Sequence, residues 1–251
     1  MHFLKRMPSS FQRRKVVISP RSYRRYWVNS LEAIHYDIFA AVQRWVCKDS
    51  VIWDIGANLG IFAFAAAVRA GAGGHVYAFE ADLEMAALMV RSLSAAVQNE
   101  AEVCVCPFAV GSREGEARFV VSGYRSAASA LDGFGRFGRN KNDRARTVPI
   151  RTVDCLARSL RAPTVIKIDV EGAENLVLEG AERVIRSCRP ILLIEASGGA
   201  SGVRTADMLR SWNYMWGPLD GAGAMRSDQG STAGNIVAVY SDHPREATQQ
   251  C

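Results

Sequence analysis

Hydrophobic and polar positions follow two different periods along most of the chain. Short apolar runs, typical of buried strands, alternate with longer segments in which apolar residues recur every three or four positions, as in helices that pack by one face. Strands and helices that alternate in this way form a parallel sheet covered by helices. The sequence therefore predicts an α/β fold with a doubly wound, mostly parallel sheet, of the Rossmann-like kind.

The predicted elements follow one another from about residue 30 to residue 240. Strands are expected over residues 51–54, 75–79, 103–110, 116–121, 148–153, 164–168, 191–194 and 235–240. Helices are expected over residues 30–45, 61–69, 82–97 and 205–212, in a short segment from residue 154, and between the turn at residue 172 and Arg189-Pro190. We expect the first of these helices to cover one edge of a ligand site.

The least regular stretch is 122–146, which holds several glycines and arginines with little periodicity. A loop of this length inside a compact domain is unusual and is often a functional lid. A disordered insertion explains the same composition equally well, so the sequence leaves both interpretations open.

A glycine-rich turn separates the apolar run at 51–53 from an alanine-rich helix. The residues of this turn are Asp54, Gly56, Ala57, Asn58 and Gly60. Glycines here allow a ligand to approach the backbone, or the helix to approach the strand. The helix start offers unpaired N–H groups and the positive end of the helix dipole. The pattern predicts the first half of a nucleotide-binding βαβ unit.

The acid ahead of the glycines argues against a phosphate-containing cofactor. The spacing is D-x-G-x-x-x-G, whereas dinucleotide sites use G-x-G-x-x-G and place a pyrophosphate at the helix start. Asp54 would repel phosphate but suits an ammonium or hydroxyl group, and S-adenosylmethionine (SAM) carries both without a phosphate. Glu80, at the end of the next strand, is placed to accept both ribose hydroxyls. The alternative is an ordinary strand–turn–helix with solvated acids.

A second apolar strand ends in acids and a glycine turn over residues 164–174, TVIKIDVEGAE. Ligands of such sheets bind at the carboxyl ends of the strands, so the acids at these ends are expected to share one cleft. These acids are Asp54, Glu80, Asp169, Glu171 and Glu195.

The acids of the second motif are candidates for general-base catalysis. Asp169 and Glu171 follow the strand end, and Lys167 shares a strand face with Asp169, where it could lower the pKa of that carboxyl or orient it. The same acids could instead cap a helix, and Glu195 could either bind substrate or be structural. A divalent metal would need a third ligand, none has a clear spacing, and we predict no metal. His35 and His75 are expected to be structural.

Together these motifs resemble the FkbM family of SAM-dependent methyltransferases. The resemblance covers roughly residues 50–200 and rests on DIGANLG at 54–60, Phe79-Glu80, KIDVEGAE at 167–174, Gly180-Ala181, Arg189-Pro190 with Glu195, and RTVD at 151–154. It implies that Asp54, Gly56, Asn58 and Gly60 line the methionine side of SAM and that Glu80 holds its ribose. It also implies O-methylation of a hydroxyl on a sugar, glycolipid or polyketide-like molecule. Ala81 departs from the family pattern, in which proline often follows the acid.

The net charge of +6 is concentrated at the front of the chain, where the first 30 residues contain eight Lys or Arg and no Asp or Glu. A solvated arm, a surface for an anionic partner and an organelle transit peptide all explain this composition. Tyr23, Tyr26 and Trp27 suit either stacking on bases or packing onto the domain. We expect residues 1–49 to form a basic arm and covering helix, 50–241 the methyltransferase domain, and 242–251 a tail.

The six cysteines form no C-x-x-C pair, and Cys104 and Cys106 are expected to be buried on one strand face. Without a disulfide framework, a secretory h-region or an apolar run long enough for a membrane span, the expected location is the cytoplasm. The expected partner is a small hydroxylated acceptor. The basic arm keeps a nucleic-acid methyltransferase or nucleic-acid-binding protein as the alternative, although the chain lacks the Asn/Asp-Pro-Pro-Tyr/Phe motif of amino-group methylation. A non-enzymatic scaffold with this fold is a third hypothesis, and the oligomeric state is not readable from the sequence.

Overall fold

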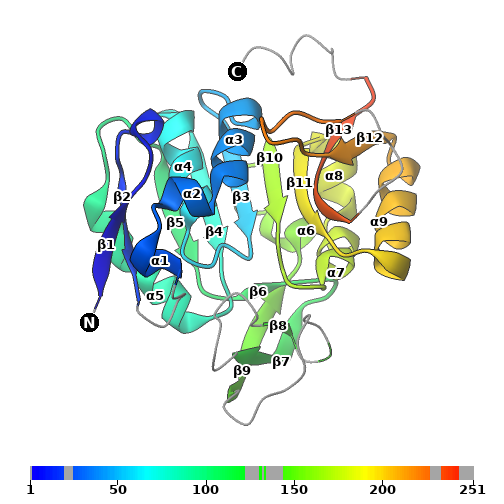
Figure 1. Ribbon diagram of the computed structural model, residues 1–251. Helices are drawn as coiled ribbons and strands as arrows, with labels where there is room; N and C mark the ends of the chain where they lie inside the picture. Colours follow the sequence, from blue (N-terminus) through cyan, green and yellow to red (C-terminus); the bar gives the residue numbers. More distant parts are fainter. Residues whose placement is uncertain are drawn as a thin grey trace.

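The computed structural model of the protein describes residues 2–19, 25–121, 130–131, 133, 144–226 and 233–242. The described part forms a three-layer α/β arrangement in which helices cover both faces of a central sheet (Figure 1). The predicted fold class is confirmed.

The central sheet has seven strands in the order β12-β13-β11-β10-β3-β4-β5. Their bounds are β3 Val51–Ile55, β4 His75–Phe79, β5 Glu102–Cys106, β10 Val165–Ile168, β11 Ile191–Ala196, β12 Tyr214–Pro218 and β13 Gly234–Tyr240. The five strands from β11 to β5 are parallel, whereas β13 runs antiparallel to both of its neighbours. Strands β3, β4, β10 and β11 are covered on both faces and are therefore nearly continuous apolar runs, which is why the sequence located them, whereas alternate residues of the edge strand β5 are exposed.

Two hydrophobic cores lie on opposite faces of this sheet. One includes buried residues of α3 Tyr36–Trp45, α4 Ile61–Ala70 and α5 Leu83–Ser92. The other includes residues of α7 Glu174–Glu179, α8 Glu182–Cys188 and α9 Gly199–Ser211, with the fully buried Trp53 of β3 at its centre. The short helix α6 Val153–Leu156 lies on this second face, beside α8.

A smaller sheet lies below the carboxyl ends of the central strands in Figure 1. Its order is β6-β9-β7-β8, with bounds β6 Ala109–Val110, β7 Gly115–Val121, β8 Ala130–Leu131 and β9 Arg144–Arg151. The single strand predicted over 103–110 is therefore wrong: it divides at Pro107 between β5 and β6, because proline cannot donate to a sheet ladder. Most of the irregular stretch 122–146 lies outside the described residues.

Two predicted helices are interrupted in the structure. The helix expected over 30–45 consists of α2 Leu31–Ile34, capped by Ser30, and α3, with His35 between them. The helix after the second motif is divided into α7 and α8 at Gly180, where a Cβ atom would lie 2.1 Å from the carbonyl oxygen of Gly111. The close backbone approach requires glycine at this position, and glycine is a poor helix former, which favours a break there. The helix expected over 82–97 ends at Ser92 and continues as a 3-10 turn, Leu93–Ala95.

The N-terminal segment packs onto the domain, so of the explanations that the sequence left open, a solvated arm does not describe residues 2–19. Strands β1 Phe3–Arg6 and β2 Lys15–Ile18 form an antiparallel hairpin joined by a 3-10 turn at Ser9–Phe11. The fully buried Arg14 pairs with both carboxylate oxygens of Glu100 at 2.8 and 3.0 Å and stacks over the ring of Phe64 at 3.8 Å. After the hairpin, α1 Arg25–Val28 leads into α2. Arg21, Tyr23 and Arg24 lie outside the described residues.

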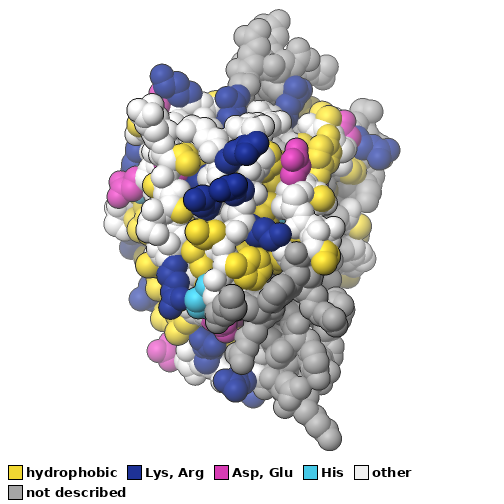
Figure 2. Space-filling view, turned by 60° about the vertical axis from the view of Figure 1, so that its left-hand side comes forward, with side chains coloured by type: hydrophobic (Ala, Val, Ile, Leu, Met, Phe, Trp, Pro, Cys, Tyr) yellow, Lys and Arg dark blue, Asp and Glu magenta, His cyan; other side chains and the backbone are white. Residues whose placement is uncertain are grey.

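Figure 2 shows the N-terminal side of the molecule, where Lys and Arg side chains lie among hydrophobic ones with few acidic side chains in view. No helix within the described residues is long and apolar enough to span a bilayer. Cys104 is exposed and Cys106 buried, so the expectation that both are buried is wrong for Cys104, which lies on the edge strand β5.

Candidate functional site

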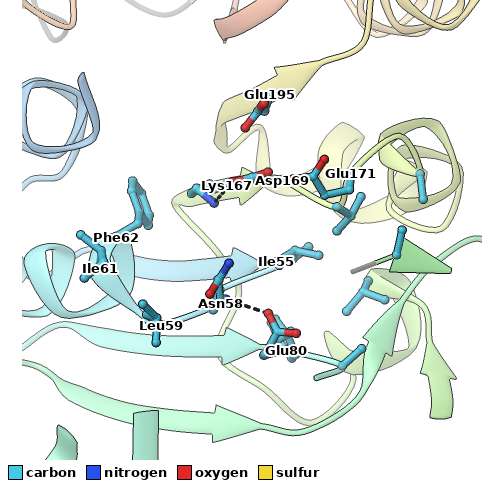
Figure 3. Close-up of a pocket in the computed structure, with 18 of the residues that line it drawn as sticks. Ile55, Asn58, Leu59, Ile61, Phe62, Glu80, Lys167, Asp169, Glu171 and Glu195 are labelled. Carbon is cyan, nitrogen blue, oxygen red and sulfur yellow. Dashed lines mark hydrogen bonds and ion pairs between the residues drawn. The ribbon is translucent and has the colours of Figure 1, made fainter. Parts of the chain in front are cut away.

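A cavity of about 450 Å³ opens at the carboxyl ends of β3, β4, β10 and β11. Figure 3 shows its lining side chains converging from the central strands and from the start of α4. Elements α1, α2 and α3 contribute lining residues on one side, and the smaller sheet contributes Phe119, Ala130 and Leu131 on another. The predicted acids lie together here: Glu80, Asp169, Glu171 and Glu195 all line this cavity. The expectation that the first predicted helix covers one edge of the site is consistent with Ile34, Asp37 and Ile38 in the lining.

The glycine loop after β3 forms part of the cavity wall through Gly56, Ala57 and Asn58. Gly56 has a φ of +80°, and a Cβ atom on it would lie 1.9 Å from the carbonyl oxygen of Asp169. The absence of a side chain therefore allows the two motif loops to touch. Gly60 does not line the cavity. A Cβ atom on it would collide with Phe64 and Met89, so this glycine lets α4 pack closely at its own start.

Glu80 is held by backbone N–H groups from two loops. Asn58 donates to Oε2 at 2.7 Å and Asp82 donates to Oε1 at 2.6 Å. Burial raises the pKa of Glu80 to about 7, and the charges of Asp82 and Asp54 add to this effect, whereas the two hydrogen bonds oppose it. The carboxyl is thus fixed in place at the cavity wall, and its charge changes near neutral pH.

Asn58 places an unsatisfied polar atom in the same wall. Its side-chain oxygen is buried and has no hydrogen-bond partner among the described residues. The residue adopts a left-handed φ of 52°, which asparagine tolerates better than most residues. A buried acceptor without a partner is costly, and a ligand donor would remove that cost.

Lys167 connects the two motifs electrostatically. Its Nζ lies 3.1 Å from Oδ2 of Asp169 (Figure 3). The same Nζ lies 3.5 Å from Oδ1 of Asp54. Burial alone would lower the pKa of Lys167, but the carboxylates of Asp169, Asp54 and Glu195 outweigh it and raise that pKa, so the ammonium stays charged. Asp54 itself is fully buried outside the cavity lining, and burial raises its pKa against the opposing effect of Lys167. The acid ahead of the glycines therefore lies beside Lys167 rather than in the cavity wall.

The second glycine turn is organised by an acid that the sequence analysis left without a role. Glu174 is buried and accepts hydrogen bonds from the N–H of Gly172 at 2.8 Å and from the hydroxyl of Ser197 at 3.3 Å. Glu171, with a φ of 52°, lies in the same turn and reaches the cavity. The turn thus presents Asp169 and Glu171 to the cavity, while Glu174 fixes it to the segment after β11.

Four polar residues of the cavity were not assigned to it from the sequence: Tyr26, His35, Asp37 and Asn235. The Tyr26 hydroxyl and His35 Nε2 lie 2.7 Å apart, and Asn235 Nδ2 donates to Asp37 Oδ2 at 3.0 Å. The sequence expectation for His35 is therefore incomplete, because this histidine lies in the cavity wall. His75 lies at the amino end of β4, 3.5 Å from Glu102. The described residues contain no group of three or more His, Cys, Asp and Glu side chains placed to hold a metal ion.

The family follows from a direct comparison of the sequence. The model of the methyltransferase FkbM domain matches residues 54–215, which is more than half of the chain. The chain belongs to the FkbM methyltransferase family. FkbM proteins use SAM, and SAM is the cofactor of this chain.

Two solved structures support the same fold for this FkbM methyltransferase. An FkbM methyltransferase from Methylobacillus flagellatus KT is 18% identical with a TM-score of 0.50, and the match covers 77% of this chain and 44% of that one. A precorrin-6y C5,15-methyltransferase from Geobacter metallireducens GS-15 is 12% identical with a TM-score of 0.50, covering 88% and 93%. No curated protein matches the sequence. The chain spans less than half of the length of the first structure. The methyl acceptor is therefore treated below as a proposal.

The cavity fits SAM in size and chemistry. Its volume lies within the roughly 300–1,000 Å³ of small-molecule sites. A carboxylate offers about four lone-pair sites, and the two backbone donors on Glu80 leave acceptor capacity for hydroxyl groups. Asn58 adds an acceptor without a partner among the described residues, and among those residues Lys167 is the only Lys or Arg that lines the cavity.

Proposed function

We propose that this FkbM protein is an O-methyltransferase that acts on a hydroxyl group of a small molecule, such as a sugar, glycolipid or polyketide-like compound. SAM supplies an electrophilic methyl group on a sulfonium centre. The contribution of the chain is to hold the cofactor and acceptor in line and to remove the hydroxyl proton.

The loops after β3 and β4 are proposed to hold the cofactor. Glu80 accepts the ribose hydroxyls with the lone pairs that its backbone donors leave available. Ala57 and Asn58 line the methionine side, where the buried side-chain oxygen of Asn58 accepts from an ammonium group. Asp54 and Gly60 are proposed to contribute without contacting the cofactor. Asp54 pairs with Lys167, and Gly60 allows α4 to start close to the loop.

The loop after β10 is proposed to hold the acceptor. The observation that carries this proposal is that Asp169 lines the same cavity as Glu80 while its Oδ2 lies 3.1 Å from the Lys167 ammonium. The contact fixes the carboxylate in the cavity wall, and we propose this carboxylate as the base that takes the proton from the acceptor hydroxyl. Glu171 and Glu195 extend the polar wall, and Asn235, beside Glu195 in the β11–β13 register, is held by Asp37. These groups suit recognition of several hydroxyls on one acceptor.

The experiment is an assay of S-adenosylhomocysteine formation with a panel of sugars, glycosides and polyhydroxylated compounds, followed by mass spectrometry of the product. The proposal expects a methyl ether. Methylation only of nucleic acid, or a product methylated on carbon or nitrogen, would refute the O-methyl assignment while leaving the methyltransferase family intact.

A further inference from the structure

The N-terminal side of the protein exposes a group of large apolar side chains. Six such side chains are exposed within the described residues, and five of them lie on the N-terminal elements or on α5. The five are Leu4, Val28, Tyr36, Leu83 and Val90. The sixth, Val203, lies on α9. Single exposed apolar residues are ordinary, but their concentration on one side of a protein indicates an interaction surface.

The elements that carry these residues are joined to one another. Strand β2 packs against α5, where the backbone N–H of Val17 donates to the Ser92 hydroxyl at 2.9 Å. Strand β1 contacts the end of α1 through a 3.2 Å hydrogen bond from Lys5 Nζ to the carbonyl of Asn29. On α5, the positions Leu83, Ala87 and Val90 follow helical spacing and are all exposed. Hairpin, α1 and α5 therefore form one continuous side of the molecule.

The hairpin on this side is basic, whereas the neighbouring helices also carry exposed acids: Glu32 on α2, Asp37 on α3 and Glu84 on α5. Residues 2–19 contain no Asp or Glu, and Figure 2 shows Lys and Arg side chains among the hydrophobic ones. The exposed basic residues of the hairpin and α5 are Arg6, Arg13, Lys15 and Arg91. Arg6 and Lys15 lie directly opposite each other in the β1–β2 register. Like charges at such a position destabilise a hairpin, and an anionic partner would remove the penalty.

The cavity opens beside this surface. Tyr26 and Ala81 line the cavity, and each is two residues from an exposed apolar side chain, Val28 and Leu83 respectively. Tyr36 directly follows the cavity residue His35. An acceptor presented at the surface would therefore enter next to these side chains.

We propose that this N-terminal face, defined by Leu4, Val28, Tyr36, Leu83 and Val90 with Arg6, Arg13, Lys15 and Arg91, docks on an anionic lipid bilayer. Aliphatic side chains insert at the boundary between headgroups and acyl chains, tyrosine favours the interface, and basic side chains bind anionic headgroups. A nucleic acid explains the basic residues but not the exposed aliphatic ones, because bases stack on aromatic rings. The inference goes beyond the proposed O-methyl transfer and does not depend on it.

The experiment is co-sedimentation of the full chain, without cofactor, with vesicles of phosphatidylcholine containing phosphatidylglycerol and with vesicles of phosphatidylcholine alone. Each basic residue near an anionic surface contributes about fivefold in affinity. The double variant Arg6→Gln/Lys15→Gln should therefore bind the anionic vesicles about 25-fold more weakly, without loss of stability since it removes a like-charge pair. The double variant Leu83→Ser/Val90→Ser should lose about tenfold. Matched controls are Val203→Ser and Arg158→Gln, exposed residues away from this face, which should bind as the wild type does.

Selective binding to anionic vesicles that both face variants weaken would support the proposal. Equal binding to both vesicle types, absence of binding, or equal losses in the controls would overturn it. If the protein shifts duplex nucleic acid in a gel and does not bind vesicles, the face would be assigned to nucleic acid instead. If the protein does not bind vesicles but self-associates in analytical ultracentrifugation, and the Leu83→Ser/Val90→Ser variant does not, the face would be assigned to a second copy of the chain. SAM binding by calorimetry, measured on the same samples, keeps these outcomes separate from a failure of the methyltransferase assignment.

Discussion

The backbone N–H of Asn58 lies 2.7 Å from Oε2 of Glu80, and this hydrogen bond joins the glycine loop after β3 to the end of β4. The contact fixes the carboxyl of Glu80 at the cavity wall. It also means that a change at Glu80 affects both the loop and any ligand that the carboxyl holds.

Replacing Glu80 by Gln should weaken SAM binding. The amide keeps an oxygen but loses the charge, and a hydrogen bond to a charged group contributes about 1.5–3 kcal/mol, so the dissociation constant should rise about 10–100-fold. Isothermal titration calorimetry measures the change. Glu84→Gln, at an exposed position at the start of α5, is the matched control and should bind SAM like the wild type. Unchanged affinity in Glu80→Gln would remove the ribose assignment.

SAM affinity should rise with pH through about 7, because burial raises the pKa of Glu80 to about 7 and the ribose hydroxyls need the ionised carboxylate as acceptor. The same shift acts on stability in the opposite sense. Glu80 in the folded state binds a proton more tightly than its ordinary value of 4.5 allows in the unfolded chain, so its contribution to stability is present below pH 4.5 and is lost as pH rises towards 7. Titrations of wild type and Glu80→Gln across this range test the claim. A wild-type pH profile retained in Glu80→Gln would assign the titration to another group.

Replacing Asp169 by Asn should reduce turnover by about 100-fold or more while changing SAM affinity by less than about threefold, since a general base contributes roughly 10²–10⁴ to the rate. The rate is followed as S-adenosylhomocysteine formation with the acceptor found in the panel above. Glu171→Gln tests the neighbouring acid of the same turn. If Glu171→Gln causes the larger loss of turnover, the base is Glu171. If neither variant loses turnover, the two carboxylates only bind the acceptor.

Replacing Gly56 by Ala should destabilise the domain by about 2–4 kcal/mol, because the new Cβ meets a backbone carbonyl at 1.9 Å and the φ of +80° is strained for alanine. Urea denaturation measures the loss. Gly221→Ala, where a Cβ has open space around it, should change stability by less than about 0.5 kcal/mol. Equal stability of the two variants would mean that the motif loops do not approach as closely as described.

Replacing Arg14 by Met should destabilise the protein by about 3–5 kcal/mol, because it leaves Glu100 charged and nearly buried without its partner. Urea denaturation again gives the value. The exposed pair Arg186–Glu182 offers the comparison: Arg186→Met should cost less than about 1 kcal/mol. A small effect at Arg14 would show that the hairpin is attached by its apolar residues alone.

The sequence located β3, β4, β10 and β11 and the acids at their ends because buried parallel strands are continuous apolar runs, whereas β12 was not predicted. Asp169 and Glu80 directly follow such runs, so it was predictable that both lie at the same edge of the sheet. The N-terminal hairpin could not be predicted, since its strands are short and its many basic residues, Arg14 among them, are typical of a solvated arm. Only tertiary structure provides Arg14 with Glu100 and the ring of Phe64.

Glycines showed the same limit. Gly56 and Gly60 occupy one motif, but only Gly56 lines the cavity, whereas Gly60 serves helix packing. The spacing of the motif predicts that glycine is needed at these positions. It does not indicate which neighbouring atoms a side chain would meet. Tyr26 and Asn235 were missed for a related reason: they reach the cavity from elements at opposite ends of the chain, outside any motif.

The most direct test of the central claim is a crystal structure of the protein with S-adenosylhomocysteine. The claim predicts both ribose hydroxyls within hydrogen-bond distance of the Glu80 carboxylate and the amino acid end of the ligand beside Asn58. A ligand whose ribose lies away from Glu80, or a cavity closed by the protein's own side chains, would contradict it.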